Sequence, residues 1–524
     1  MRIWYNIHIL LLTERINIMK LNYKRVICVG LAFFLISAFW QAYDTIIPKI
    51  LTDKFGLNQS ISGAVMALDN ILALFMLPLF GTLSDKCKSK HGKRTPFIMI
   101  GTICAVVAFI GMSFADSAQL AMLKSVEPTA PNAQAVLYEA DLTAKTPAGE
   151  EFAVCEKFTK EEFTAIKMYG EDEKVTAEYK DYVVPARQAY ARKLTAENPG
   201  KLIVFIAVLL VTLLSMATFR SPAVALMPDV TVKPLRSKAN SIINLMGAAG
   251  GIIVLILGMV FGTGKSENAI MNYTAFFCVI AGIMLLALCV FKLTVNEPKL
   301  VAQMEEDTKK YGLEDAPEEE DEQGGSRKLS RGEFASLILI LASVALWYMG
   351  YNAVTSKYSV YASTVLQLDY NLTLMIATAA AIVCYIPAGL LASKFGRKKT
   401  ILAGVIMLGT AFFIASFATS EWSVMAMNVI FVLAGMGWAT INVNSYPMVV
   451  ELSRGGDVGK YTGFYYTASM AAQTITPMLS GFFMDIKMES LFVYATVMVF
   501  AAFFTMICVK HGDAKPLAKS EAKK

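Results

Sequence analysis

The sequence PLFGTLSDKCKSKHGKRTPFI, at residues 78–98, is the most informative part of this chain. An apolar run leads into it, five Lys and Arg residues lie in its middle, and a second apolar run follows Pro96. Two membrane helices joined by a short loop have this pattern, and a basic loop of this kind stays on the cytoplasmic side. The stretch therefore predicts a membrane protein whose first basic loop is cytoplasmic.

Two residues of this stretch predict close contacts between helices. Gly81 allows two helix backbones to approach each other, as small residues do in membranes. Asp85 can pair with a cation or lie near the positive N-terminus of another helix. A loop that only orients the chain in the membrane would explain the charges equally well, but it would not explain the order of the residues.

That order resembles, almost position by position, the loop between the second and third helices of plant and animal sucrose transporters of the major facilitator superfamily. The loop is longer between Asp85 and Gly92 than in the commonest form of the superfamily, as it also is in the related glycoside-pentoside-hexuronide cation symporters. The resemblance implies an all-α membrane protein with twelve transmembrane helices in two six-helix bundles.

The composition agrees with a protein that crosses the membrane many times. Of the 524 residues, 55% are hydrophobic and 17% charged, and the mean hydropathy is +0.50. Soluble domains carry about 25% charged residues. The eight Cys have no metal-ligand spacing, so neither a disulfide framework nor a metal site is expected. No Walker motif supports ATP-driven transport, and neither an enzyme nor a nucleic-acid-binding protein is expected.

Hydropathy predicts twelve spans as six plus six, with both termini in the cytoplasm because the basic loops then all lie inside. The expected spans are at about 26–47, 62–83, 96–114, 201–228, 240–261, 271–293, 334–355, 372–392, 399–418, 422–446, 461–484 and 489–509. The expected domains are an N-terminal bundle at 1–295, a charged cytoplasmic linker at 296–333, a C-terminal bundle at 334–510 and a cytoplasmic tail at 511–524. The acidic run at 314–322 of the linker is expected to be disordered.

A polar insertion at 116–199 interrupts the first bundle. It has ten basic and fifteen acidic residues, a net charge of −5, and long translocated loops escape the positive-inside bias, so we expect it outside the cell. Its aromatic spacing predicts a small helical cap without an internal disulfide. An ordered or partly disordered loop without a role in transport is favoured over a part in substrate binding. At the start of the chain, residues 1–18 lack a cleavage site, so Met19 is the expected natural start.

The basic loop has a second copy at 389–399, which supports two related halves around a central site. Asp229 and Glu451 end the fourth and tenth spans at matching positions of the two halves. In the superfamily such acids meet basic-loop residues when the transporter faces outward, and the resemblance therefore implies a cytoplasmic gate. Its expected members are Gly81, Asp85, Arg94 and Asp229, with Arg397 and Glu451 as the weaker counterpart in the second half.

Two carboxylates inside the spans are candidates for proton coupling. An ionisable residue at the bilayer centre costs about 3 kcal/mol or more, which points to a function. Asp44 and Asp69 lie toward the outer half of neighbouring helices and could line one cavity, where two close carboxylates favour binding of a proton. The three His lie outside the apolar runs and cannot replace them. Helix-end residues in the headgroup region are the alternative, above all for Asp44.

Arg220, in the fourth span, is the first candidate for substrate binding. The segment RSPAVALMPD resembles the Arg-Ala-Leu-Leu-Ala-Asp segment of sucrose transporters with looser spacing, and a guanidinium can donate several hydrogen bonds to sugar hydroxyls. Aromatic rings and amides suit the CH faces and hydroxyls of a sugar, although interfacial belts explain some of the aromatic residues equally well. The further candidates are Asn70, Trp347, Tyr351, Asn352, Trp438, Asn442 and Gln473.

A sequence difference from the related sodium symporters indicates which ion drives transport. Melibiose-type symporters carry two Asp where this chain has Ala73 and Leu77, so a proton is favoured and no other cofactor is expected. We expect a monomeric transporter in the plasma membrane that takes up a disaccharide or glucoside together with protons. Proton-driven efflux of amphiphilic compounds and a nutrient sensor with a transporter fold are the alternatives.

Overall fold

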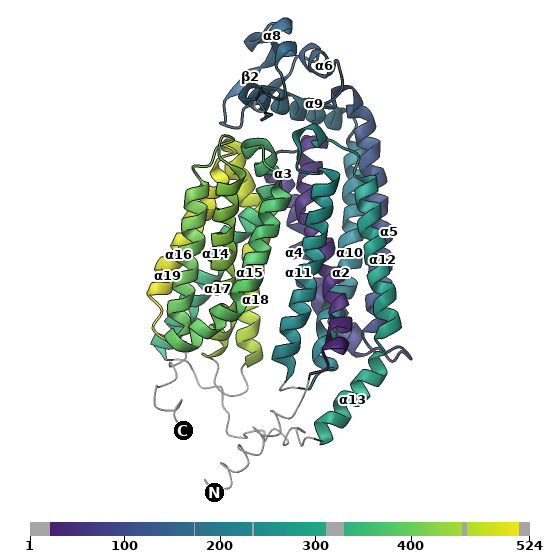
Figure 1. Ribbon diagram of the computed structural model, residues 1–524, viewed down its shortest axis with the longest axis vertical. Helices are drawn as coiled ribbons and strands as arrows, with labels where there is room; N and C mark the ends of the chain where they lie inside the picture. The colour runs from purple at the N-terminus through teal and green to yellow at the C-terminus, as the bar shows by residue number, and fades with distance from the viewer. Residues whose placement is uncertain (1–20, 172, 233–234, 311–329, 453–457, 513–524) are drawn as a thin grey trace.

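A computed structural model describes residues 21–171, 173–232, 235–310, 330–452 and 458–512. Figure 1 shows two helical bundles side by side, with a small folded unit over one end of them. The expected start at Met19 and the acidic part of the expected linker lie outside the described residues.

The first bundle has a hydrophobic core of its own, with Phe109 in its interior. The ring of Phe109 lies 5.5 Å from the ring of Phe39 and 4.4 Å from that of Phe277, between centroids. Such tight side-chain packing holds helices together in lipid, where apolar contact alone does not. The helices are α2 (Tyr23–Lys49), extended by a π-helical turn (Ile50–Lys54), α3 (Gln59–Met66), α4 (Leu68–Asp85), α5 (Thr95–Leu123), α10 (Pro199–Asp229), α11 (Arg236–Phe261) and α12 (Thr274–Thr294).

The second bundle begins at a capping box, in which Ser330 and Glu333 bond each other's backbone N–H groups. Gly350 allows its first helix to pack directly on its last, because a Cβ there would meet Val499 and the backbone of Ala495. The helices are α14 (Arg331–Tyr361), extended by a π-helical turn (Ala362–Leu366), α15 (Tyr370–Phe395), α16 (Arg397–Ala415), α17 (Val424–Val450), α18 (Val458–Ile486) and α19 (Ser490–Ile507).

The described residues contain eleven helices that are long and apolar enough to cross a membrane. The 29-residue helix α18 lies among them but is not one of the eleven. The expected count of twelve spans is therefore not confirmed by length and hydropathy alone.

The insertion is a compact unit with its own hydrophobic core, which includes Leu137, Phe152 and Phe163. It contains α6 (Ala133–Glu139), α7 (Val154–Lys157), α8 (Lys160–Ala165) and α9 (Val184–Glu197), and a hairpin of β1 (Thr143–Lys145) and β2 (Glu151–Ala153). The hairpin pairs Ala144 with Phe152. It was not predicted, because the sequence indicated a cap made of helices. Since α5 continues to Leu123, residues 116–123 belong to a membrane helix, and the insertion begins later than expected.

The first part of the expected charged linker forms the helix α13 (Glu297–Lys310), which the sequence did not predict. The helix is held in place because Leu300 and Val301 pack against the core of the first bundle. Figure 1 shows α13 at the opposite end of the molecule from the insertion. We call the end that carries residues 124–198 the insertion end, and the end that carries loop 86–94 the basic-loop end.

The two bundles are hydrogen-bonded to each other at the insertion end. The carboxylate of Asp485, at the end of α18, accepts hydrogen bonds from the backbone N–H groups of Gln59 and Ser60 at 2.6 and 2.8 Å. A Cβ at Gly63 or Gly481 would collide with a backbone carbonyl of the facing helix, so α3 and α18 lie in direct backbone contact. The bundles are therefore closed on one another at this end.

Candidate functional site

A cavity of about 170 Å³ lies between the two bundles. Six helices contribute to it, four from the first bundle and two from the second. Its walls are formed by Trp40, Tyr43 and Asp44 of α2, Met66 of α3, Asp69 and Asn70 of α4, Arg220 of α10, Asn352, Thr355 and Ser356 of α14, and Gln473 and Pro477 of α18. The structure thus brings together both candidates for proton coupling and four of the candidates for substrate binding.

Two carboxylates and one guanidinium carry the charge of this cavity. Arg220 lies close enough to Asp69 and Asp44 to interact electrostatically with both. It forms a direct ion pair with neither of them, and its guanidinium carbon lies 5.2 Å from the centre of the Trp40 ring instead. The Asp69 carboxylate accepts a hydrogen bond from the side-chain amide of Asn70 at 2.7 Å. The three charged groups sum to one net negative charge when both carboxylates are ionised.

Two hydrogen-bond donors in the cavity wall have no partner among the described residues. They are the indole N–H of Trp40 and the side-chain amide nitrogen of Asn352, and both atoms are buried. Buried polar atoms in proteins almost always have a partner, and each exception requires an explanation. Since one donor comes from each bundle, a polar ligand between the bundles could accept from both.

Four candidates for substrate binding do not line this cavity. Trp347 is fully buried in the core of the second bundle, so this prediction is corrected: no surface of it is left for a ligand. The Tyr351 and Trp438 rings stack on each other at 3.6 Å, with 2° between their planes. Asn442 is hydrogen-bonded to the hydroxyl of Tyr385. These aromatic contacts stabilise the second bundle beside the cavity.

Arg94 connects the basic loop to α10. Its guanidinium donates to Asp229 at 2.8 Å and forms an ion pair with Asp85 at 2.5 Å. It also donates to the Ser84 hydroxyl, which the sequence did not single out. Burial lowers the pKa of Arg94, but the hydrogen bonds and charges of Asp229 and Asp85 more than offset this and raise it overall. The group therefore stays charged.

These contacts all lie within the first bundle. A Cβ at Gly81 would lie 3.0 Å from the Ser221 hydroxyl of α10, so the glycine does permit a close approach of two helices. In the second bundle Arg397 pairs with Glu451 at 2.8 Å and donates to the Pro447 carbonyl. The structure brings the expected residues of each pair together, and their role in gating stays a prediction.

Glu297 is a further residue of the basic-loop end, and no sequence pattern pointed to it. Its carboxylate is buried and accepts from the backbone N–H groups of Lys93, Arg94 and Thr95 at 2.7 to 3.0 Å. It also accepts from the Thr95 hydroxyl at 2.8 Å. An acidic group at this position satisfies the free N–H groups at the start of α5 and interacts favourably with the helix dipole. Gly92, at φ +102°, lies against the same side chain.

A buried ion pair near the insertion end was also missed. The ammonium of Lys54 lies 2.6 and 2.7 Å from the two oxygens of Asp116, and both side chains are fully buried. The Tyr273 ring lies 4.5 Å from the same ammonium. The sequence predicts Asp116 to lie in the polar insertion, but the residue lies inside α5 and is fully buried.

A family comparison supports what the fold indicates. The sequence profile of the Major Facilitator Superfamily matches residues 195–386 and 369–524, which is more than half of the chain. The chain belongs to the major facilitator superfamily. A second profile, described as MFS/sugar transport protein, matches residues 28–126 of this superfamily member. Membership of a transporter superfamily agrees with the expectation that the protein is not an enzyme.

Curated proteins resemble only part of this superfamily member. It is 32% identical over 84 residues to the "Putative glycoside/cation symporter YagG" of Escherichia coli (strain K12), which is 16% of this chain and 18% of the relative. It is 36% identical over 67 residues to "Sucrose transport protein SUC3" of Arabidopsis thaliana, which is 13% of this chain and 11% of the relative. The matched part thus spans less than a fifth of these curated relatives.

The fold is also that of solved members of the superfamily. The structure of the xylose transporter XylE from E. coli in its inward open conformation matches with a TM-score of 0.59, over 95% of this chain and 98% of that chain. The two sequences are 13% identical, so this likeness shows the fold alone. The expected major facilitator fold is confirmed.

Proposed function

We propose that the protein is a proton-coupled symporter that carries a disaccharide or glucoside across the plasma membrane by alternating access. The observation that carries this proposal is the cavity between the bundles, which holds two carboxylates, one guanidinium and unpartnered hydrogen-bond donors. A site at the interface of two related bundles is accessible from one side at a time as the bundles rock. In this proposal the transporter acts as a monomer with no cofactor other than the proton.

Charge balance supports the proton as the coupling ion. Asp44 and Asp69 together carry two negative charges against the single positive charge of Arg220. An uncompensated charge is costly in a site without bulk water, and one bound proton removes the excess. Ala73 and Leu77 provide no carboxylate for a sodium ion. Release of the proton when the cavity opens to the other side would couple the gradient to transport.

The polar groups of the cavity support a sugar as substrate. Asn70, Asn352 and Gln473 offer amide donors and acceptors, and Trp40 offers an apolar ring with an N–H group. The two curated relatives described above are named a sucrose transport protein and a glycoside/cation symporter. Small-molecule sites typically enclose about 300–1,000 Å³, so a disaccharide requires the cavity of about 170 Å³ to widen as the bundles separate.

The gate would then lie at the basic-loop end. Breaking the ion pairs of Arg94 with Asp85 and Asp229 would free that loop to move relative to α10. Because these pairs join parts of one bundle, the movement they control is a rearrangement inside that bundle. While the Arg94 pairs are broken, the hydrogen bonds that Asp485 accepts from Gln59 and Ser60 would keep the insertion end closed.

The test is uptake by the purified full chain reconstituted into vesicles. Labelled sucrose, maltose and a simple glucoside are offered with and without an inward proton gradient, for the wild type and for Asp69→Asn. We expect gradient-driven uptake of at least one sugar, its loss in Asp69→Asn, and retained sugar exchange at equal pH. Glu421→Gln is the matched control, because that carboxylate is exposed in the loop before α17.

Other outcomes separate the alternatives. Uptake that ignores the gradient, or that survives equally in Asp69→Asn, would contradict proton symport through this cavity. Gradient-driven extrusion of amphiphilic dyes without any sugar flux would indicate efflux. Sugar binding with no flux in either direction would indicate a sensor.

A further inference from the structure

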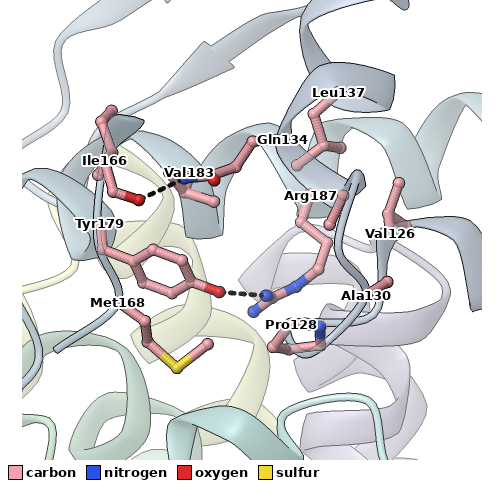
Figure 2. A pocket seen from close by; sticks show the side chains of 11 residues that line it. Val126, Pro128, Ala130, Gln134, Leu137, Ile166, Met168, Tyr179, Val183 and Arg187 are labelled. Atoms are coloured by element: carbon pink, nitrogen blue, oxygen red, sulfur yellow. Dashed lines mark hydrogen bonds between the residues drawn. The ribbon is translucent and has the colours of Figure 1, made fainter. Parts of the chain in front are cut away.

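The insertion contains a cavity of its own, separate from the one between the bundles (Figure 2). It encloses about 80 Å³. Figure 2 shows Arg187 of α9 extending into it toward the ring of Tyr179, with Gln134 and Ile166 on the far wall. The apolar members of the wall come from α6 and from the segments before and after it. A cation therefore lies in a small cavity whose wall has both polar and apolar parts.

Arg187 lacks most of the partners that a buried guanidinium needs. The residue is 2% exposed, and one of its terminal nitrogens donates to the Tyr179 hydroxyl at 3.2 Å. Its Nε atom is buried and has no acceptor in the described part of the chain. Because the Tyr179 oxygen accepts in this bond, its own proton remains available to another acceptor. Arg187 and Tyr179 both line the cavity, and each thus has a donor left for a ligand.

Arg187 has no direct carboxylate partner in the described part of the chain. Among the ion pairs formed by the described residues, none includes this side chain. The carboxylate of Asp53 accepts a hydrogen bond from the adjacent Gln188 instead, at 2.9 Å. Lys49 is near enough to add positive potential. A buried charge is retained in proteins when it is paired and hydrogen-bonded, and here the protein supplies no such pair.

We propose that this cavity is a binding site for a small monovalent anion, held by Arg187 and Tyr179. At about 30 Å³ per water-sized group, the space admits two or three such groups. A halide or a small carboxylate such as formate has this size. The planar guanidinium suits a carboxylate in particular, because its N–H groups match the two oxygens. The bound anion would compensate the Arg187 charge and stabilise the core of the insertion.

The test is hydrogen exchange of the purified full-length protein, at constant ionic strength, as sodium formate replaces sodium gluconate. We expect saturable protection of backbone amides in residues 124–198, with no comparable change in the bundle helices, because a ligand stabilises the unit that binds it. Arg187→Gln should abolish the protection, and Tyr179→Phe should weaken formate binding about tenfold. Lys193→Gln is the matched control, since it removes one exposed charge from the same helix.

A crystal soaked in sodium bromide gives an independent readout. Anomalous density beside Arg187 would support the site, and water there in its place would overturn the proposal. Formate protection that is absent in the wild type, or unchanged in Arg187→Gln, would overturn it as well. If Arg187→Gln does not fold, Tyr179→Phe decides, because unchanged formate affinity in that variant would contradict the assigned donors.

Discussion

Replacing Asp116 with Asn should destabilise the protein more than any substitution of an exposed charge, because it leaves the Lys54 ammonium buried without its counter-charge. Both side chains are fully buried, and the nitrogen lies within 2.7 Å of each carboxylate oxygen. At this distance and an effective dielectric constant of about 20, the attraction between the two charges is about 6 kcal/mol.

Part of that attraction survives in the variant. The Asn carbonyl still accepts a hydrogen bond, and the Tyr273 ring still lies 4.5 Å from the ammonium. Breaking a buried pair by removing one partner costs about 3–5 kcal/mol. We expect a loss in this range for Asp116→Asn. The double variant Lys54→Met with Asp116→Leu should return to within about 1 kcal/mol of the wild type, because apolar residues of similar volume replace buried pairs well.

The assay is equilibrium unfolding by SDS in mixed micelles, followed by helical circular dichroism. It compares Asp116→Asn, the single variants Lys54→Met and Asp116→Leu, and the double variant that combines these two. Lys265→Gln is the matched control, because its ion pair with Glu267 spans 3.6 Å and the Lys side chain is 60% exposed. It should cost less than about 1 kcal/mol. A loss below about 1 kcal/mol for Asp116→Asn, or a double variant as unstable as the sum of the single ones, would refute the reasoning.

Three more predictions concern the ends of the bundles. Arg94→Lys should reduce the transport rate about tenfold or more, since one ammonium cannot reproduce the charged hydrogen bonds to two carboxylates. Transport rates in vesicles test this, and an unchanged rate would contradict a role of Arg94 in gating. Glu297→Ala should lower the free energy of unfolding by about 2–4 kcal/mol, because backbone N–H groups at the start of α5 lose their acceptor; a loss within about 0.5 kcal/mol in SDS unfolding would count against it. Gly149→Val should separate the insertion from α18, since φ is +97° and a Cβ would meet the Ile486 carbonyl; proteolysis of residues 146–150 should become faster, and equal rates would contradict this.

Much of the transmembrane architecture follows from the sequence. A helix that crosses lipid must satisfy its backbone internally and be apolar over its length, so hydropathy locates it. The same constraint makes ionisable residues inside spans rare, which is how Asp44, Asp69 and Arg220 could be selected before any contact was known. The structure places all three in one cavity.

Features that the membrane does not determine were harder to predict from the sequence. The helix α13 depends on the packing of Leu300 and Val301 on a distant core, whereas its sequence indicated only a charged linker. The hairpin β1–β2 has three residues in each strand, too few for a clear alternating pattern. Trp347 was assigned to the substrate site by its type, but its place in the core depends on how α14 is rotated against its neighbours.

The sequence alone therefore determines a two-bundle membrane transporter of the major facilitator superfamily, its basic loops and its few intramembrane charges, because the bilayer imposes strong local rules on composition. The partners of those charges are settled by tertiary packing. Glu297 meets Arg94 across 203 positions of the chain, and Lys54 meets Asp116 across 62. Such contacts depend on the rotation and closeness of whole helices, and no local pattern encodes these.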